Sequence, residues 1–307
     1  MISWVKRFFA ATDSNGHAFV DKLKTAMPAD VGAFYDQYND QFLKVYGEVI
    51  QAYRTTDVSK LLDYEIASIG FEQGMRVCDA GCGVGGPAFY FAEKCGVSID
   101  AVTISKVQFE KARNNSAGKV KFHLGDYHQL PNLFGAEQFD VVYFLESFGH
   151  SYDPVLAIRS AWEVLKPGGY LYIKDLFRKL AVLPEHQPKI DQQVSRINEA
   201  YRYNIGDLNN VLDALRKQGF AIMFIKTVDL KLEDFENLTI SNDFQELTGI
   251  AKIDNWEEYI FPVDFFEIKC YKPQHDLQFG LDKYFLQNMY WMQVHKKKQE
   301  QLNYGKL

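Results

Sequence analysis

The sequence contains no run of about twenty apolar residues, so we expect no segment that spans a membrane. Its first residues, MISWVKRFFAATDSNG, lack the long apolar centre of a secretory signal, which favours a cytoplasmic location. Long basic blocks are also missing, because the largest is Lys296–Lys298 and the net charge of the chain is −6. A nucleic-acid-binding protein is usually more basic, so we expect no nucleic-acid partner.

Cysteine is scarce as well, with four residues in a chain of 307. They lie at Cys78, Cys82, Cys95 and Cys270 and suggest no disulfide framework. Cys78 and Cys82 are four positions apart, but no second pair of ligands accompanies them. We therefore predict no zinc site and no other metal held by the protein alone.

Aromatic residues, by contrast, are abundant. The chain has 18 Tyr and 24 Phe, and aromatic residues make up 15% of it. This composition indicates a large core, an aromatic-lined pocket, or both. The length allows one large domain with insertions or two modest domains.

Five short runs of β-branched and aromatic residues alternate with helical patterns in the middle of the chain. The runs cover 75–81, 98–105, 120–126, 139–146 and 169–175. The helical patterns cover 86–95, 106–115 and 155–165. Strands that alternate with helices of about ten residues predict a parallel sheet with crossover helices on both faces.

The two ends of the chain are predicted to be mostly helical. Residues 1–60 are expected to be helical, and 42–53 carry an apolar stripe with helical spacing. The interval 177–206 shows no strand pattern. The rest is predicted as a helix at 206–220 ended by Gly219, a strand at 221–230, a helical insertion near 231–260, a strand at 264–272 and a helical tail at 276–307. We thus expect an N-terminal lid at 1–60, a cofactor-binding core at 61–177, substrate-binding insertions with the sixth strand at 178–262, and the last strand with its tail at 263–307.

A strand, a carboxylate and a glycine-rich turn follow one another in VCDAGCGVGG, residues 77–86. Gly81, Gly83 and Gly85 let the backbone turn sharply and approach a ligand. A Gly-x-Gly-x-x-Gly turn most often indicates a dinucleotide. Here the spacing is Gly-x-Gly-x-Gly, and Asp79 would repel a pyrophosphate but suits a cationic amino-acid group. This combination points to S-adenosylmethionine, which carries a sulfonium and an ammonium group.

On this motif the sequence resembles the class I methyltransferases over residues 61–177. The resemblance implies an α/β fold with a doubly wound, mostly parallel, seven-stranded Rossmann-like sheet, a helical N-terminal lid and helical insertions. VTISKVQ, at the end of the second predicted strand, matches the Thr-x-Ser-x-x-Gln variant of the cyclopropane-fatty-acid synthase and sterol methyltransferase group. HLGDYHQLP matches the third-strand motif, in which Asp126 would take the adenine amino group and Tyr127 would flank the ring. The implied cofactor-binding residues are Asp79, Gly81, Cys82, Gly83, Thr103, Ser105, Gln108, Asp126, Tyr127 and Leu145.

Simpler interpretations of two of these motifs remain open. Ser105 can cap a helix, with Gln108 completing its capping box. An aspartate that ends a strand, as Asp126 does, is often a helix cap.

The stretch FDVVYFLESFGHSYDP, residues 139–154, ends the fourth predicted strand with a carboxylate, Glu146, and an imidazole, His150. Ligands of open parallel sheets bind beyond the carboxyl ends of the strands, so both side chains are expected beside the transferred methyl group. Glu146 can also be a cofactor contact or a helix cap, and His150 can be an ordinary buried or exposed imidazole.

This region is similar to two groups of C-methyltransferases. LESFGH matches the Glu-x-x-x-His pattern of sterol C-methyltransferases, and Glu146 with Ser147 matches the Glu-Ser pair of geranyl diphosphate C-methyltransferases. VSRINEAYRYNI at 194–205 and LTGI at 247–250 resemble the latter group as well, except that Arg196 stands where an uncharged amide is expected. The implied catalytic residues are Glu146 and His150, and the candidate substrate-binding residues are Phe34, Tyr35, Tyr38, Phe148, Arg196, Asn198 and Asn204.

The resemblance implies a C-methyltransferase that acts on an alkene carbon of an isoprenoid or similar apolar small molecule. Methyl transfer to an alkene leaves a carbocation, which aromatic faces stabilise and which a base such as Glu146 quenches by removing a proton. If the acceptor carries a diphosphate, Mg²⁺ is expected through the phosphates. An N- or O-methyltransferase of a small natural product, a non-catalytic S-adenosylmethionine-binding scaffold and a homo-oligomer remain open.

Overall fold

Seven strands form one sheet in the order β3-β2-β1-β4-β5-β7-β6. In this computed structural model, which describes residues 25–115, 118–230, 236–253, 255, 257 and 259–274, they are β1 (Arg76–Ala80), β2 (Ser98–Thr103), β3 (Val120–Leu124), β4 (Phe139–Leu145), β5 (Leu165–Arg178), β6 (Ala221–Thr227) and β7 (Val263–Tyr271). The first five strands pair in parallel, whereas β7 is antiparallel to β5 and β6. The predicted mostly parallel, seven-stranded sheet is confirmed.

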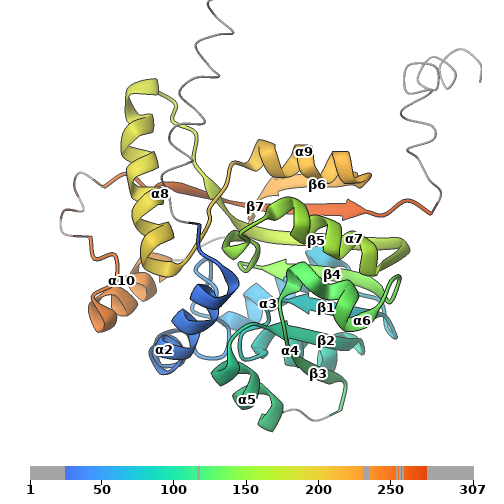
Figure 1. Cartoon of the computed structure of the whole chain (residues 1–307). Helices are drawn as coiled ribbons and strands as arrows, with labels where there is room; N and C mark the ends of the chain where they lie inside the picture. The colour runs from blue at the N-terminus through green and yellow to red at the C-terminus, as the bar shows by residue number, and fades with distance from the viewer. Residues whose placement is uncertain are drawn as a thin grey trace, which may run out of the picture.

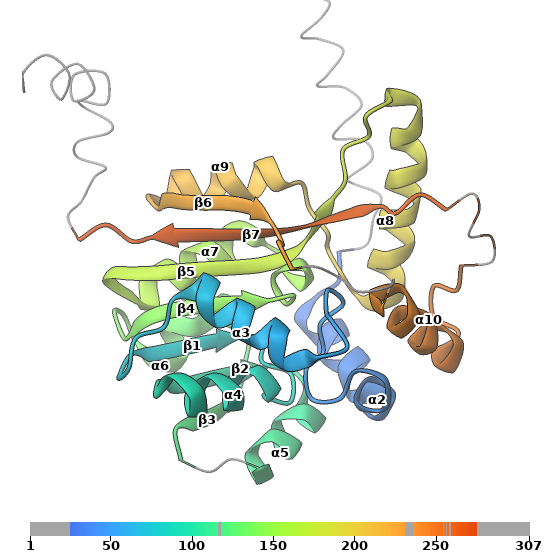
Figure 2. The same cartoon turned by 180° about the vertical axis from the view of Figure 1, so that it is seen from behind.

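Helices cover both faces of this sheet (Figures 1 and 2). One face carries α3 (Val58–Ile69) and α4 (Gly86–Cys95), and the other carries α6 (Leu130–Phe134), α7 (Pro154–Val164) and α9 (Leu208–Gln218). The unbroken apolar run of β4 follows from this arrangement, since successive side chains of a strand point to opposite faces. Val141 and Tyr143 pack in the cluster under α4, while Val142 and Phe144 pack in the cluster under α7.

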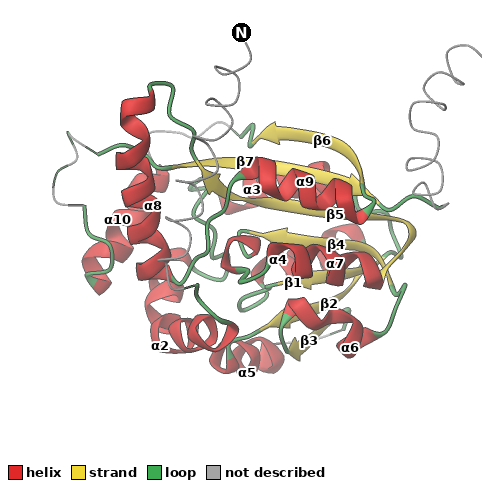
Figure 3. Ribbon diagram, turned by 45° about the horizontal axis from the view of Figure 1, so that its top comes forward, coloured by secondary structure: helices red, strands yellow, loops and turns green. Residues whose placement is uncertain are grey.

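A third group of helices gathers at the carboxyl ends of the parallel strands (Figures 1 and 3). It consists of α2 (Pro28–Tyr46), α8 (Gln187–Tyr201) and α10 (Glu236–Thr248), while α5 (Lys106–Asn115) lies beside α2. Stacked aromatic rings join α2 to α10, with Phe42 and Phe244 separated by 4.3 Å between ring centroids. Part of the aromatic surplus is therefore used to build a helical wall beside the site.

The predicted helix over 42–53 is wrong beyond its first turn. Helix α2 ends at Tyr46, because Gly47 adopts a positive φ of 68° and its N–H closes the last turn on Leu43. Residues 47–57 then form an irregular segment, which we call the 47–57 loop. Two of its N–H groups donate to Glu146 instead of to helix carbonyls, so a tertiary contact replaces the helix that the apolar spacing favours.

Most of the other predicted elements lie where expected. β5 extends beyond the predicted 169–175, α9 ends at Gly219 in the left-handed conformation, and α10 lies inside the predicted 231–260 insertion. Short 3-10 turns occur at η1 (Tyr127–Gln129), η2 (Phe148–His150) and η3 (Pro184–His186). The predicted tail at 276–307 and the start of the N-terminal segment fall outside the described residues. The domain boundaries stay predictions.

Within the described part of the chain, no helix is both long and apolar enough to cross a membrane. The same residues contain no group of three or more His, Cys, Asp or Glu that could hold a metal ion.

Candidate active site

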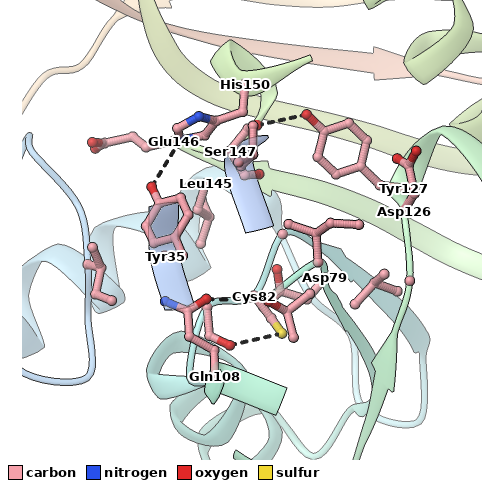
Figure 4. Close-up of a pocket in the computed structure, with 18 of the residues that line it drawn as sticks. Tyr35, Asp79, Cys82, Gln108, Asp126, Tyr127, Leu145, Glu146, Ser147 and His150 are labelled. Atoms are coloured by element: carbon pink, nitrogen blue, oxygen red, sulfur yellow. Dashed lines mark hydrogen bonds between the residues drawn. The ribbon is translucent and has the colours of Figure 1, made fainter. Parts of the chain in front are cut away.

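A pocket with about 910 Å³ of empty space, part of it open to solvent, lies beyond the carboxyl ends of β1, β2, β3 and β4 (Figure 4). The wall comes from α2, the 47–57 loop, the glycine-rich turn and the ends of β2, β3 and β4. Of the predicted site residues, it contains Tyr35, Asp79, Gly81, Cys82, Gly83, Thr103, Gln108, Asp126, Tyr127, Leu145, Glu146 and His150.

The glycine-rich turn packs tightly against the turn that follows β4. Gly81 has a φ of 108°, and a Cβ on it would lie 2.4 Å from Cβ of Ser147. The Ser147 hydroxyl donates to the carbonyl of Ala80 at 2.6 Å, which joins the two turns. A side chain at position 81 would therefore strain the backbone and separate the two turns that carry the site.

Asp79 is a buried carboxyl group that lies on the pocket wall. It is 2% exposed and accepts a hydrogen bond from the Tyr143 hydroxyl at 2.8 Å. Burial raises its pKa to about 7, and no lysine, arginine or histidine in the described residues forms an ion pair with it. An uncompensated buried carboxyl beside a cavity is suited to a cationic ligand group such as an ammonium.

Gln108 presents an unsatisfied donor in the same pocket. Its Oε1 accepts from the Thr103 hydroxyl at 3.3 Å, while its buried Nε2 has no hydrogen-bond partner. Ser105, which does not line the pocket, caps α5 by accepting the Gln108 N–H at 3.1 Å and donates to Asp36 of α2 at 2.6 Å. The simpler interpretation of Ser105 as a helix cap therefore describes its contacts, whereas Gln108 is placed to bind a ligand.

Glu146 has both carboxylate oxygens occupied. Its side chain is 2% exposed and accepts the N–H groups of Ala52 at 2.5 Å and Tyr53 at 3.2 Å. The ammonium of Lys174 lies 2.8 Å from Oε1 and also 3.2 Å from Glu65. Glu146 thus fastens the 47–57 loop to the end of β4 through two backbone N–H groups, and a buried ion pair joins its carboxylate to Lys174 of β5.

Both ring nitrogens of His150 form hydrogen bonds. Its Nδ1 lies 2.9 Å from the Arg202 carbonyl, which can only accept, so Nδ1 carries the hydrogen. Its Nε2 is then an acceptor, and the Tyr35 hydroxyl donates to it at 2.9 Å across the pocket (Figure 4). The Tyr203 ring stacks on the imidazole at 3.9 Å. Burial lowers the pKa of His150 to about 4, so the ring is neutral at pH 7.

Besides Ser105, six of the predicted site residues do not line the pocket. Phe34 and Tyr38 pack in the aromatic wall of α2, Phe148 packs in the core under α7, Arg196 is exposed and donates to the Lys252 carbonyl, Asn198 accepts the N–H of Ile205, and Asn204 bonds to Ala26 and to the His150 carbonyl. Their substrate-binding roles stay predictions.

Several site residues were missed from the sequence. Lys174, Glu65 and Gln51 form the buried polar cluster behind Glu146, and His128 lines the pocket. A lysine within the apolar strand GYLYIKD was the one available signal, because an unpaired charge is rarely buried.

Comparison with known proteins agrees with this geometry. Residues 71–219 match the family described as a methyltransferase domain. An O-methyltransferase of Aspergillus sclerotiorum is 30% identical over 64% of this chain and 77% of its own length. An O-methyltransferase of Penicillium expansum is 28% identical over 74% of this chain and 87% of its own, and a sterol 24-C-methyltransferase of Pneumocystis carinii is 28% identical over 61% and 53%. The solved structure of a geranyl diphosphate methyltransferase with its substrate and sinefungin superposes with a TM-score of 0.64, at 16% identity over 80% of this chain and 99% of that one.

The chain therefore belongs to the class I S-adenosylmethionine-dependent methyltransferases, as its glycine-rich turn and strand order indicate. The residues present fit that cofactor, since the pocket offers a carboxyl without a cation at Asp79, an unpartnered donor at Gln108 and a close backbone approach at Gly81.

Proposed function

We propose that this enzyme methylates a hydroxyl oxygen of an uncharged small molecule, with His150 as the general base. When bound, S-adenosylmethionine supplies an electrophilic methyl group on its sulfonium. The observation that carries the proposal is the orientation of His150, whose Nε2 is an acceptor turned toward the Tyr35 hydroxyl inside the pocket. A group at this position can accept the proton that an alcohol or phenol loses as its oxygen is methylated.

The surroundings of His150 suit this role. The Arg202 carbonyl keeps the hydrogen on Nδ1 and stabilises the imidazolium that forms when Nε2 takes a proton. The Tyr35 hydroxyl marks where a donor sits at hydrogen-bonding distance from Nε2. A substrate hydroxyl either replaces that of Tyr35 or donates its proton through it. A pKa of about 4 keeps Nε2 unprotonated over the whole neutral range.

Glu146 is less suited to be the base that the sequence pattern implies. Two N–H groups and the Lys174 ammonium already bind its oxygens. We assign it instead the task of holding the 47–57 loop, which contributes Glu48, Ile50 and Gln51 to the pocket wall.

The charges around the pocket disfavour an anionic acceptor. The wall includes the carboxyl groups of Glu48, Asp79, Asp126 and Glu146, and no lysine or arginine of the described residues lines it. Arg196, a candidate substrate-binding residue that stands where an uncharged amide is expected, is exposed and lies outside this wall. A diphosphate, and the Mg²⁺ that would accompany it, therefore finds no support here.

Locating a labelled methyl group tests the proposal. The enzyme is incubated with methyl-labelled S-adenosylmethionine and a panel of phenols, alcohols, isoprenoids, prenyl diphosphates and amines, and the products are analysed by mass spectrometry. We expect label on oxygen. His150→Gln should lower kcat at least about a hundredfold, because it removes the base, and should leave cofactor affinity within about twofold.

The matched variant is Glu146→Gln. It should weaken cofactor binding and thermal stability, since it loosens the 47–57 loop, and lower kcat less than His150→Gln does. A larger kcat effect from Glu146→Gln with unchanged cofactor binding would return the role of base to Glu146.

A second candidate is methylation of an alkene carbon of an uncharged isoprenoid. The aromatic wall favours it, because Tyr35 stacks on Phe42 at 5.2 Å and meets the His150 ring edge-on at 5.4 Å, and aromatic faces stabilise a carbocation. The similarity in fold to a geranyl diphosphate methyltransferase adds support. His150 would then take the proton lost from the cation, and label on carbon would select this reaction. An absence of turnover with every acceptor would favour a non-catalytic scaffold.

A further inference from the structure

The pocket contains a second histidine, His128, that the proposed reaction does not use. Its side chain lines the pocket but is only 2% exposed. Its Nδ1 lies 2.6 Å from Oδ1 of Asp126, and its Nε2 lies 2.7 Å from the hydroxyl of Ser151. The ring of Tyr152 covers it at 4.1 Å between centroids. The orientation of this imidazole is therefore fixed from three sides.

The directions of these hydrogen bonds follow from the groups involved. A carboxylate oxygen only accepts, so Nδ1–H of His128 donates to Asp126. The backbone N–H of His128 donates to the same oxygen at 2.9 Å. Oδ1 of Asp126 thus receives two hydrogen bonds from one residue, which fixes the plane of the carboxylate. No group in the described residues donates to Oδ2, which leaves that oxygen for a ligand.

We propose that His128 is a positioning residue that makes the pocket selective for the 6-amino group of a purine. The inference deepens the proposed function and rests on the expected contact between Asp126 and the adenine of the cofactor. A carboxylate held in one plane offers Oδ2 as an acceptor to an amino group. A 6-oxo purine places an oxygen there instead, and two acceptors facing each other leave both groups without a hydrogen bond.

Ser151, the hydrogen-bond partner of Nε2 of His128, follows directly on the turn that carries the proposed base His150. Ser151 is 1% exposed, and its N–H donates to the Phe148 carbonyl at 2.9 Å, which closes the turn around His150. The position of His128 is therefore set by the same turn that holds His150. Recognition of the purine and placement of the base share one chain of hydrogen bonds.

Binding of two cofactor-product analogues tests this inference without any acceptor. The affinities of S-adenosylhomocysteine and S-inosylhomocysteine, which differ in the 6-amino and 6-oxo groups, are measured by calorimetry. We expect the wild-type protein to prefer the adenine form at least about tenfold, as for a hydrogen bond to a charged group.

Two substitutions then separate positioning from support of the fold. His128→Phe keeps a ring against Tyr152 but removes both nitrogens, and it should lower the preference about tenfold. His128→Asn keeps an N–H donor near the position of Nδ1 and should retain most of the preference. Should His128→Phe not fold, Ser151→Ala replaces it, with an expected loss of about threefold because Nε2 is then unsupported.

Three outcomes would overturn the inference. One is equal weakening of both ligands by His128→Phe with the preference unchanged, or an unchanged preference in Ser151→Ala. Another is an Asp126→Asn variant that keeps the preference. The third is a wild-type protein that binds both ligands equally. Because the assay contains no acceptor, a failure of methyl transfer to oxygen would leave this result unaffected.

Discussion

Asp79 shows at the scale of one residue how the ligand-free protein is prepared for a cationic ligand. Its carboxyl is buried without a cation, and burial raises its pKa to about 7. Below that pH the group is mostly protonated and neutral, and above it the group carries the charge that an ammonium needs. Ligand binding at this site should therefore depend on pH near neutrality.

We predict that the affinity for S-adenosylhomocysteine rises with pH up to about 7 and is constant above it. Below the pKa of Asp79 the affinity should fall by up to about tenfold per pH unit, because the proton competes with the ligand ammonium. Calorimetry between pH 5.5 and 8.5 measures this. Asp79→Asn should bind weakly at every pH, whereas the exposed Asp63→Asn should behave like the wild type. A wild-type affinity that does not change between pH 5.5 and 7 would contradict the assigned role.

At the scale of elements, the buried cluster around Lys174 joins four parts of the chain that are separated in the sequence. Lys174 of β5 contacts Glu146 at the end of β4, Glu65 of α3 and Gln51 of the 47–57 loop. Burial alone would lower the pKa of Lys174, but Glu146 and Glu65 together hold it above its usual value. The ammonium is thus the centre of a compensated charge cluster.

Removing that ammonium should be costly. We predict that Lys174→Met lowers the free energy of unfolding by about 3–5 kcal/mol, because it leaves two carboxyl groups buried without a cation. Denaturant titration measures the change. Adding Glu65→Gln and Glu146→Gln to Lys174→Met should restore part of the stability, since a neutral cluster has no charge to compensate. Lys217→Met, which breaks an exposed pair with Asp213, is the control and should change stability by less than about 1 kcal/mol. If Lys174→Met lowers the free energy of unfolding no more than Lys217→Met does, the ammonium of Lys174 does not stabilise the fold.

At the scale of the whole molecule, several perturbed groups act on stability together. Burial raises the pKa values of Glu65, Asp79 and Asp175 to about 7, so the folded chain binds protons there more tightly than the unfolded chain. His150, with its pKa lowered to about 4, acts in the opposite direction between about pH 4 and 6.5. Because folding raises the pKa of three groups and lowers that of one, the folded chain binds more protons than the unfolded chain in this pH range. Lower pH therefore favours the folded state.

We therefore predict that the ligand-free protein loses stability as the pH rises from 5 to about 7.5 and changes little just above that. Each raised carboxyl adds stability that is present below its unfolded pKa and declines as the pH passes through the folded value. Denaturation midpoints at pH 5, 6, 7 and 8 test this. In Asp175→Asn the slope should be smaller. A midpoint that rises steadily over the range would mean that these carboxyl groups are not perturbed as described.

The sheet and its helices could be predicted from the sequence because their signals are local. The apolar run of β4, the turn at Gly81 and the end of α9 at Gly219 each depend on neighbouring residues. The partners of Glu146 could not be predicted, since Ala52 and Lys174 are separated from it by 94 and 28 positions and one of them contributes only a backbone N–H. The same tertiary contact explains why the helix predicted over 42–53 ends early.

The 47–57 loop also has a consequence for the order of events in turnover. A Cβ on Gly86 would lie only 2.3 Å from the carbonyl oxygen of Glu48. The loop therefore packs directly against Gly86, the first residue of α4, which follows the glycine-rich turn. Glu146 and Lys174 hold this stretch of backbone in place, and the same loop forms part of the pocket wall. We therefore expect the strength of this contact to set how long the product stays bound, independently of the rate of methyl transfer.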